Sequence, residues 1–257
     1  TCGLTYAGLP DVDQGVPLGL HGRVSNTPAS NACCDSEWQG DEYVMWVQGK
    51  VRESAAYGED VVLTRRISAR LGESSIWVDD SVENLGHEST PHMFLYHING
   101  GFPAVDAGSS MLSPTMLFTP RNEDAELDRD IYDSFGSPES GFQQRVSYHD
   151  MASEADGTVL VALVNRNIPG GFGFYIRYNR ADLPVFTECK MSGLGTYMAC
   201  IEPGNCRVEG RSKERENGTL QTLEPGEIRK YKIEIGVLAS MESIAQVEQR
   251  IAAMKRP

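Results

Sequence analysis

The sequence lacks the surplus of basic residues that a nucleic-acid-binding surface requires. It holds 23 Lys and Arg against 36 Asp and Glu, which gives a formal net charge of −13. Because phosphate binding needs clustered Lys and Arg, this charge argues against nucleic-acid partners, and it also disfavours anionic membranes. We find no secretory signal in it, and no apolar run approaches the length of a transmembrane helix. The expected partner is therefore neither a nucleic acid nor a membrane.

Cysteine pairs of the CxxC type are also missing, so a structural zinc site is not expected. The adjacent residues Cys33 and Cys34, in a chain of 257 residues, are typical of a reducing compartment, and we expect a cytoplasmic protein. The six cysteines are Cys2, Cys33, Cys34, Cys189, Cys200 and Cys206.

The first residue is Thr1 rather than an initiator methionine, and residues 1–4 resemble the end of a strand. We therefore expect a further segment upstream. The length is within reach of one large all-β domain. A hydrophobic content of 40% and 26 glycines suit a sizeable core with many turns. The prediction is a single domain over residues 1–257.

Alternating apolar and polar residues predict strands through most of the chain. Residues 43–51, 61–69 and 75–84 have this period of two, with glycine-containing turns between them, which indicates an antiparallel sheet. Gly170 and Gly171 stand between two predicted strands, so we interpret them as a hairpin turn rather than a phosphate loop. The later predicted strands are 144–149, 158–165, 173–178, 197–202 and 228–238.

Three segments depart from the strand pattern. Residues 1–31 are predicted to be mostly loop, and the acidic residues 113–143 are predicted to be a solvated excursion without a site. Ser240 can cap a terminal helix, because the residues after it repeat apolar positions at helical spacing. Many strands with one late helix indicate a large β-sandwich or barrel.

The stretch from His92 to Asp106 carries the first candidate site. An apolar run reads as a strand and breaks at Gly100 and Gly101. His97 and Asn99 are two residues apart, so their side chains point to the same face. A polar side chain there needs a partner. His97 is either a core histidine satisfied by its neighbours or a proton donor at the mouth of a sheet.

Two further stretches repeat this arrangement. Glu202 ends an apolar strand directly before Pro203, so it is either an exposed turn residue or a carboxylate facing an opening. In the stretch 20–23, Gly22 suits a close backbone approach to a ligand, and Arg23 offers a planar fork for hydroxyls, carboxylates or phosphates. Two His, one Arg and one Glu, each beside Gly or Pro, together favour a functional site.

These stretches resemble a known superfamily. Leu20-His21-Gly22-Arg23, Leu95-Tyr96-His97-Ile98-Asn99 and Ile201-Glu202-Pro203 are similar to three landmarks of the aldose 1-epimerase (galactose mutarotase-like) superfamily. The longer runs HGRVSNTPA, TPHMFLYHINGGFP and IEPGNC resemble a bacterial branch of aldose 1-epimerase-related proteins. The resemblance covers nearly the whole chain.

The resemblance implies a galactose mutarotase-like β-supersandwich with a sugar cleft on one sheet. By position in its motif, His97 corresponds to the general acid on the ring oxygen and Glu202 to the general base on the anomeric hydroxyl. His21 corresponds to the histidine on the ring-oxygen side. The sugar-binding aspartate of galactose mutarotases has no match, since Asp106 follows His97 too soon, and we expect Lys190 in the cleft instead. The predicted substrate-binding residues are Arg23, Asn99, Asp106, Lys190 and Asn205.

The implied activity is the interconversion of sugar anomers in carbohydrate metabolism. Opening a cyclic hemiacetal needs one proton removed from O1 and one delivered to the ring oxygen, which requires no metal or organic cofactor. One alternative is a metal-dependent sugar isomerase with His92, His97 and Glu202 as ligands. His92 and His97 differ in strand parity, which disfavours it. The other alternative is a carbohydrate-binding protein without catalysis. The sequence is compatible with a homodimer.

Overall fold

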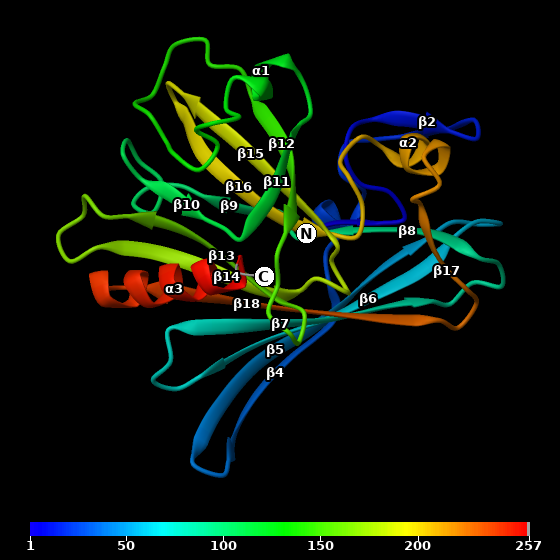
Figure 1. Cartoon of the computed structure of the whole chain (residues 1–257). Helices are drawn as coiled ribbons and strands as arrows, with labels where there is room; N and C mark the ends of the chain where they lie inside the picture. The colour runs from blue at the N-terminus through cyan, green and yellow to red at the C-terminus, as the bar shows by residue number, and fades with distance from the viewer. Residues whose placement is uncertain (256–257) are drawn as a thin grey trace. The chain divides into compact units, whose positions relative to one another are not determined.

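The computed structural model describes residues 1–255 and consists mostly of β-strands (Figure 1). The chain divides into two compact units. Unit 1 contains Thr1–Tyr96 and Gly204–Ile233, and unit 2 contains His97–Pro203 and the chain from Glu234 onward. The predicted all-β class is confirmed, while the prediction of a single domain stays a prediction. No helix in the described residues is long and apolar enough to cross a membrane.

Unit 1 is built on a meander of long antiparallel strands, β4 to β7, which Figure 1 shows in blue to cyan. The three strands predicted between residues 43 and 84 are confirmed, but β4 was not predicted. Strand β8 pairs with both β1 and β17. The elements are β1 (Cys2–Leu4), β2 (Asp11–Asp13), β3 (Val16–Leu18), a 3-10 turn η1 (Val24–Asn26), β4 (Ser30–Gln39), β5 (Glu42–Ser54), β6 (Asp60–Arg70), β7 (Ser75–Asn84), β8 (Thr90–Leu95), α2 (Arg211–Glu216) and β17 (Gln221–Leu223).

Unit 2 contains a sheet in the order β16-β15-β12-β11, with β9 added on β16. A second group is formed by β10, β13 and β14, and the β13–β14 hairpin confirms the predicted turn. The elements are β9 (Ile98–Gly100), β10 (Ser110–Leu112), β11 (Thr115–Pro120), α1 (Glu123–Glu126), β12 (Arg145–Met151), β13 (Thr158–Asn165), β14 (Phe172–Asn179), β15 (Val185–Gly193), β16 (Thr196–Gly204) and α3 (Met241–Met254). Strand β18 (Ile228–Leu238) continues from unit 1 into unit 2.

The predicted terminal helix is confirmed as α3. The side chain of Ser240 accepts a hydrogen bond from the backbone N–H of Ser243, and the Ser243 side chain bonds back to the N–H of Ser240. This reciprocal capping satisfies two backbone donors that the helix leaves unpaired. Ile244 and Ile251 on its apolar face are buried in unit 2. Hydrophobic burial thus fixes the helix that the sequence periodicity indicated.

The segment 113–143 corrects one prediction, because it is only partly solvated. It contains β11 and α1, and it carries the buried residues Asp128 and Phe135. Asp128 pairs with Arg145 of β12 and with Lys190 of β15. Two cations allow a carboxylate to be buried where an unpaired one would be excluded. The acidic composition therefore concealed a segment that packs on the sheet.

Candidate functional site

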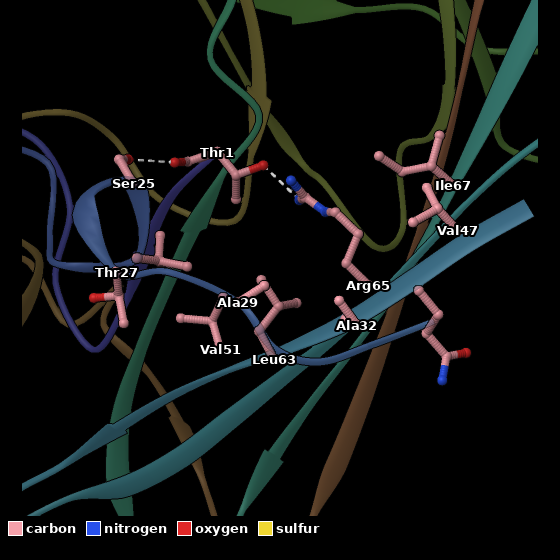
Figure 2. Close-up of a pocket in the computed structure, with 13 residues that line it drawn as sticks. Thr1, Ser25, Thr27, Ala29, Ala32, Val47, Val51, Leu63, Arg65 and Ile67 are labelled. Carbon is pink, nitrogen blue, oxygen red and sulfur yellow. Dashed lines mark hydrogen bonds between the residues drawn. The ribbon is translucent and has the colours of Figure 1, made fainter. Parts of the chain in front are cut away.

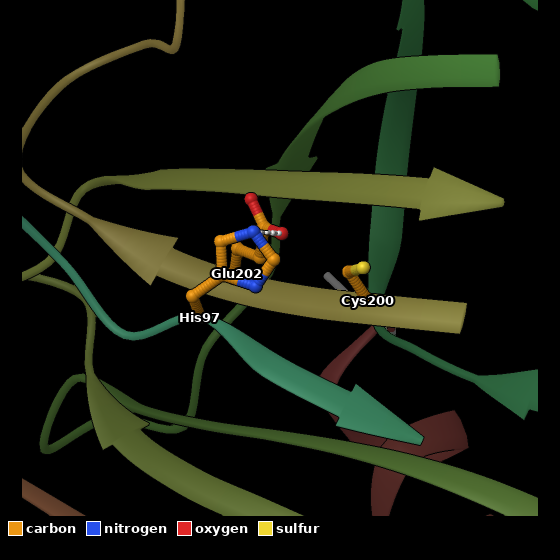
Figure 3. Close-up of side chains that lie close together, drawn as sticks. All are labelled: His97, Cys200 and Glu202. Carbon is orange, nitrogen blue, oxygen red and sulfur yellow. Dashed lines mark ion pairs between the residues drawn. The ribbon is translucent and has the colours of Figure 1, made fainter. Parts of the chain in front are cut away.

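The antiparallel pairing of β9 with β16 brings the two predicted proton carriers together. Asn99 lies opposite Cys200 in this register, so the side chains of His97 and Glu202, each two residues away, lie on the same face. Figure 3 shows the imidazole of His97 directed at the carboxylate of Glu202, with Cys200 next on the same strand. Both residues belong to unit 2. The sheet register therefore assembles the pair.

The geometry of the pair fixes the positions of the imidazole hydrogens. His97 Nε2 lies 3.2 Å from Glu202 Oε1, and His97 Nδ1 lies 2.7 Å from Asn99 Oδ1. An amide oxygen can only accept, so Nδ1 carries a hydrogen and donates it to Asn99. The lone pair of Nε2 then faces the carboxyl group of Glu202. Asn99 therefore orients the imidazole and selects its tautomer.

Burial controls the charge of the pair. Burial raises the pKa of Glu202 to about 8, and burial lowers the pKa of His97 below its ordinary value. The close approach of the two groups would by itself favour an ion pair, but the loss of hydration on both sides outweighs it. At neutral pH the protonated carboxyl of Glu202 donates to the neutral Nε2 of His97. The pair thus holds one mobile proton.

Access distinguishes the two members of this pair. The side chain of Glu202 is 4% exposed, whereas that of His97 is 24% exposed. The structure places Glu202 inside β16 and not at its end, so the expected position at a strand end is corrected. The cause is that Pro203 and Gly204 continue the strand, which pairs onward with β8 at Gly204. A substrate can approach from the imidazole side.

Two cysteines beside the pair were missed by the sequence analysis. The thiol of Cys200 lies within 4.8 Å of a carboxylate oxygen of Glu202. Cys189 lies on the neighbouring strand β15, where Gln144 Nε2 donates to its Sγ at 2.9 Å. All six cysteines are free thiols. The only signal in the sequence was the position of Cys200 two residues before Glu202. Its contact with Cys189 depends on the β15–β16 pairing, which the sequence did not predict.

His97, Cys200 and Glu202 also offer three possible metal-ligating atoms within 4.8 Å of one another. A nitrogen, a thiol sulfur and a carboxylate oxygen form a donor set suited to zinc. Here His97 and Glu202 bond each other, and the interaction with Cys189 together with burial raises the pKa of the Cys200 thiol, which disfavours the thiolate that a metal requires. The metal alternative with His92 loses that ligand. Both ring nitrogens of His92 are engaged in unit 1, by Leu4 O at 3.2 Å and the Tyr231 hydroxyl at 2.7 Å.

A second histidine–glutamate pair, also unpredicted, lies in unit 2. His149 Nε2 is 3.1 Å from Glu188 Oε2, and both side chains are buried. His149 Nδ1 bonds the hydroxyl of Thr115, and Nε2 bonds that of Ser147, each at 3.0 Å. Glu188 precedes Cys189 on β15, so it points to the opposite face of the strand. This pair therefore lies on the other side of the sheet from Glu202.

Lys190 and Asp106, two predicted binding residues of unit 2, are bonded to other groups of the protein. Lys190 Nζ is 3.2 Å from Asp128 and 2.9 Å from the carbonyl oxygens of both Ile131 and Ser134. An ammonium has three hydrogens. All three hydrogens therefore have acceptors within the protein, and the role predicted for Lys190 in a sugar cleft stays a prediction. The carboxylate of Asp106 accepts from the N–H of Ala107 within its own turn.

The remaining predicted residues belong to unit 1. The Asn205 side chain accepts from the N–H of Phe94 at 2.6 Å and donates to the carbonyl oxygen of His92 at 3.2 Å, so it holds β8, and its predicted role in substrate binding stays a prediction. His21 Nδ1 accepts from Gly8 N at 3.3 Å, and Arg23 pairs with Glu59 at 3.6 Å. The roles predicted for His21 and Arg23 stay predictions.

The sequence predicted that the backbone at Gly22 approaches a ligand closely, but the structure shows that it approaches the backbone of residues 3 and 6. Gly22 has φ +80°, and a Cβ there would lie 2.1 Å from the carbonyl oxygen of Gly3 and 2.5 Å from that of Tyr6. Glycine is needed because only a residue without a side chain fits this space. Packing within unit 1, with no ligand, thus explains this glycine.

Unit 1 also contains a pocket of about 460 Å³, which Figure 2 shows between the start of the chain and strands β4 to β6. Apolar side chains such as Val24, Val47 and Leu63 line most of it. Arg65 on its wall is already held by Asp80 and Thr1. None of the predicted site residues lines this pocket. A sugar needs many hydrogen-bonding groups, so we do not assign it as the sugar site.

Comparison with known proteins gives a family and a fold. A family model described as a domain of unknown function (DUF4432) matches residues 1–237. No curated protein shows significant similarity. A Klebsiella pneumoniae structure described as a candidate aldose 1-epimerase is 26% identical, with a TM-score of 0.94 over 99% of this chain. The present chain spans 66% of the length of that protein.

More distant structures share the fold alone. A candidate aldose 1-epimerase from Escherichia coli K12 is 14% identical with a TM-score of 0.53, over 91% of this chain and 82% of its own. A galactose mutarotase-like protein from Lactobacillus casei is 12% identical with a TM-score of 0.55, over 91% and 84%. These likenesses confirm the predicted galactose mutarotase-like β-supersandwich with a short C-terminal helix.

Proposed function

The chain belongs to the family described as a domain of unknown function (DUF4432), and from its likeness to the Klebsiella pneumoniae structure and the His97–Glu202 pair we propose that it is an aldose 1-epimerase-like enzyme. It binds a sugar and interconverts its anomers by general acid–base ring opening. The observation that carries the proposal is the 3.2 Å contact between the partly exposed His97 and the buried Glu202, where burial raises the pKa of Glu202 to about 8.

The single proton shared by His97 and Glu202 suits this reaction. Ring opening removes a proton from the anomeric hydroxyl and delivers one to the ring oxygen, so the enzyme must hold one proton and one vacant site. When the mobile proton passes from Glu202 to His97, the carboxylate becomes the base and the imidazolium becomes the acid. Ring closure on the other face of the carbonyl reverses both transfers. No net proton is gained or lost over the cycle.

Asn99 supports the acid role of His97. Its Oδ1 accepts the Nδ1 hydrogen at 2.7 Å, and this bond strengthens when the ring becomes cationic. The same bond keeps Nε2 directed at the reacting proton. Asn99 is thus proposed as an orienting residue rather than only a sugar ligand. Substrate binding by Asn99 stays a prediction.

The test is a panel of aldoses examined by NMR exchange spectroscopy, with the parent protein and Glu202→Gln compared on each sugar. Glutamine keeps the shape of the side chain but cannot accept the proton, so we expect exchange to fall by about 10²–10⁴-fold. Calorimetric affinity should change little, because the amide can still bond the hydroxyl. Glu188→Gln is the matched control, because it makes the same change at the buried glutamate of the His149–Glu188 pair.

Three results would replace the proposal. A parent that accelerates exchange of no aldose is not a mutarotase. A parent that binds sugar without exchange is a carbohydrate-binding protein. Production of a ketose that stops after dialysis against a chelator and returns with zinc indicates metal-dependent isomerisation instead.

A further inference from the structure

Three side chains on one face of the unit 2 sheet lead to the proposed base. Gln144 donates to Cys189 Sγ at 2.9 Å. Cys189 and Cys200 lie on the paired strands β15 and β16, which form one hairpin, and Cys200 Sγ lies within 4.8 Å of a carboxylate oxygen of Glu202. Val146 of β12 lies opposite Cys189, and Asn99 of β9 lies opposite Cys200. The thiols therefore occupy adjacent strands at the centre of this face. Both are buried, at 4% and 0% exposure.

The number of hydrogens limits what Cys200 can do. A thiol has one S–H, and Cys200 has two acceptors within reach, the sulfur of Cys189 and the carboxylate of Glu202. It can donate to only one of them at a time. Cys189 is supported from its other side by the Gln144 amide at 2.9 Å, so it can accept whether or not Cys200 donates to it.

We propose that Cys200 is a positioning residue whose S–H turns between Glu202 and Cys189 as the proton leaves and returns to Glu202. This inference rests on the proposed function of Glu202 as the base. While the carboxylate is ionised, the S–H donates to it. When the carboxyl is protonated, the S–H turns to Cys189. Only the S–C bond rotates, and no bond to sulfur forms or breaks.

The groups that face Glu202 agree with this arrangement. They are His97 before β9, Cys189 on β15 and Cys200 on β16. The bond from Cys200 lowers the pKa of Cys189 against the effect of burial, with Gln144 and Arg121 acting in the same direction and Glu188 in the opposite one. A bond from Cys200 lowers the pKa of Glu202, and Cys189 competes with Glu202 for the same S–H. The two thiols thus act on Glu202 with opposite signs.

This opposition gives a sharp test with Cys200→Ala and Cys189→Ala. Loss of the S–H donor removes a bond to the ionised carboxylate, so in C200A the titration midpoint of Glu202 rises by about one pH unit. Loss of Cys189 leaves Cys200 with Glu202 as its acceptor, so in C189A the midpoint falls. The measurement is 13C NMR of the labelled Glu202 carboxyl, beside the pH profile of exchange.

Two further variants serve as rescue and control. Cys200→Ser restores a donor, so its midpoint should return to the parent value or below. Cys206→Ala removes a buried thiol of unit 1 and should leave the midpoint unchanged. At neutral pH, C200A should lower kcat about tenfold with little change in KM, because it weakens an interaction made mainly while Glu202 is ionised.

The two proposals fail separately. If no aldose is exchanged but the midpoints move in opposite directions, the thiols act on Glu202 and the proposed function is wrong. If exchange occurs and C200A has the parent midpoint, the role of Cys200 is overturned. Midpoints that move in the same direction for C200A and C189A also overturn it, since loss of packing alone would act alike at both positions. Should C200A fail to fold, C189A and C200S still decide, because the inference requires a fall in the first and no rise in the second.

Discussion

The His97–Glu202 and His149–Glu188 pairs place the same two side chains at nearly the same separation, 3.2 and 3.1 Å. The imidazole of His97 is 24% exposed, while that of His149 is 0% exposed. Both ring nitrogens of His149 bond hydroxyl groups, and the rings of Phe118, Tyr132 and Phe186 stand edge-on around it. An imidazole that is enclosed and bonded at both nitrogens can neither meet a sugar nor exchange a proton with it.

The alternation of β15 separates these two environments. Glu188 and Cys189 are neighbours in sequence and point to opposite faces of the strand. On the face of Glu188, segment 113–143 covers the sheet through Tyr132 and Asp128. On the face of Cys189, the sheet carries Glu202 and its thiol neighbours. The comparison shows that access, rather than the type of pair, selects the candidate site.

The sharpest way to break the comparison is His97→Asn. Asparagine cannot carry the acid proton, so we expect anomer exchange to fall by about 10²–10⁴-fold with the unfolding free energy little changed. Exchange spectroscopy and urea denaturation measure the two effects. His87→Asn is the control, because His87 is an exposed histidine of unit 1. Parent-like exchange in H97N would assign the acid elsewhere.

His149→Ala should have the reverse effect. It leaves Glu188 buried without its partner and opens a cavity, so we expect a loss of about 3–5 kcal/mol in unfolding free energy. Exchange per folded molecule should stay within a factor of two or so, since this pair contacts no substrate. A large fall in exchange with unchanged stability would make His149 a catalytic residue and would reverse the comparison.

The pH profile of exchange should report the exposed pair alone. The pair works while it holds one mobile proton. With the pKa of Glu202 at about 8, activity should fall about tenfold per pH unit above that value, as the proton is lost. Because the pKa of His97 is lowered, the acid limb, where a second proton binds, lies below 6.5. In H149A both limbs should stay in place. Limbs that move in that variant would show that the two pairs are coupled.

The smallest expected effect is in segment 113–143, which packs over the buried His149–Glu188 pair. Lys190→Met removes the bonds to Asp128 and to two carbonyl groups of segment 113–143, at a cost of about 1–2 kcal/mol. Limited proteolysis within the segment should become faster, while sugar affinity stays the same. Lys230→Met, at an exposed position of β18, is the control. Weaker sugar binding in K190M alone would place Lys190 in the cleft.

The sequence predicted the strands whose apolar residues alternate or run together. Residues 158–165 and 228–238 were predicted with the bounds that the structure has, because neither segment contains a competing turn signal. Strand β4 was missed because all ten of its residues are exposed, so no core imposes a pattern on them. Strand β15 was missed because Glu188 and Lys190 interrupt its apolar run. Both are buried only through partners distant in sequence.

The residues of the candidate site could also be predicted from local sequence, but their contacts across strands could not. The strand parity of His97 and Asn99 and the resemblance at Glu202 named the residues that the structure brings together. The contacts of Cys189, and the full use of the Lys190 ammonium, depend on which strands become neighbours. Local periodicity does not specify that pairing.

The register of β16 has a consequence for how this site can diverge between relatives. β16 is fixed by Asn99 opposite Cys200 and by Leu95 opposite Gly204. One residue inserted between Cys200 and Glu202 would turn Glu202 to the far face of the sheet. In evolution, the positions from Cys200 to Glu202 can therefore change by substitution but not by a single insertion or deletion. Related chains can be aligned here without gaps. The residues that they carry at the positions of His97 and Glu202 then separate lineages that retain the proton pair from those that have lost it.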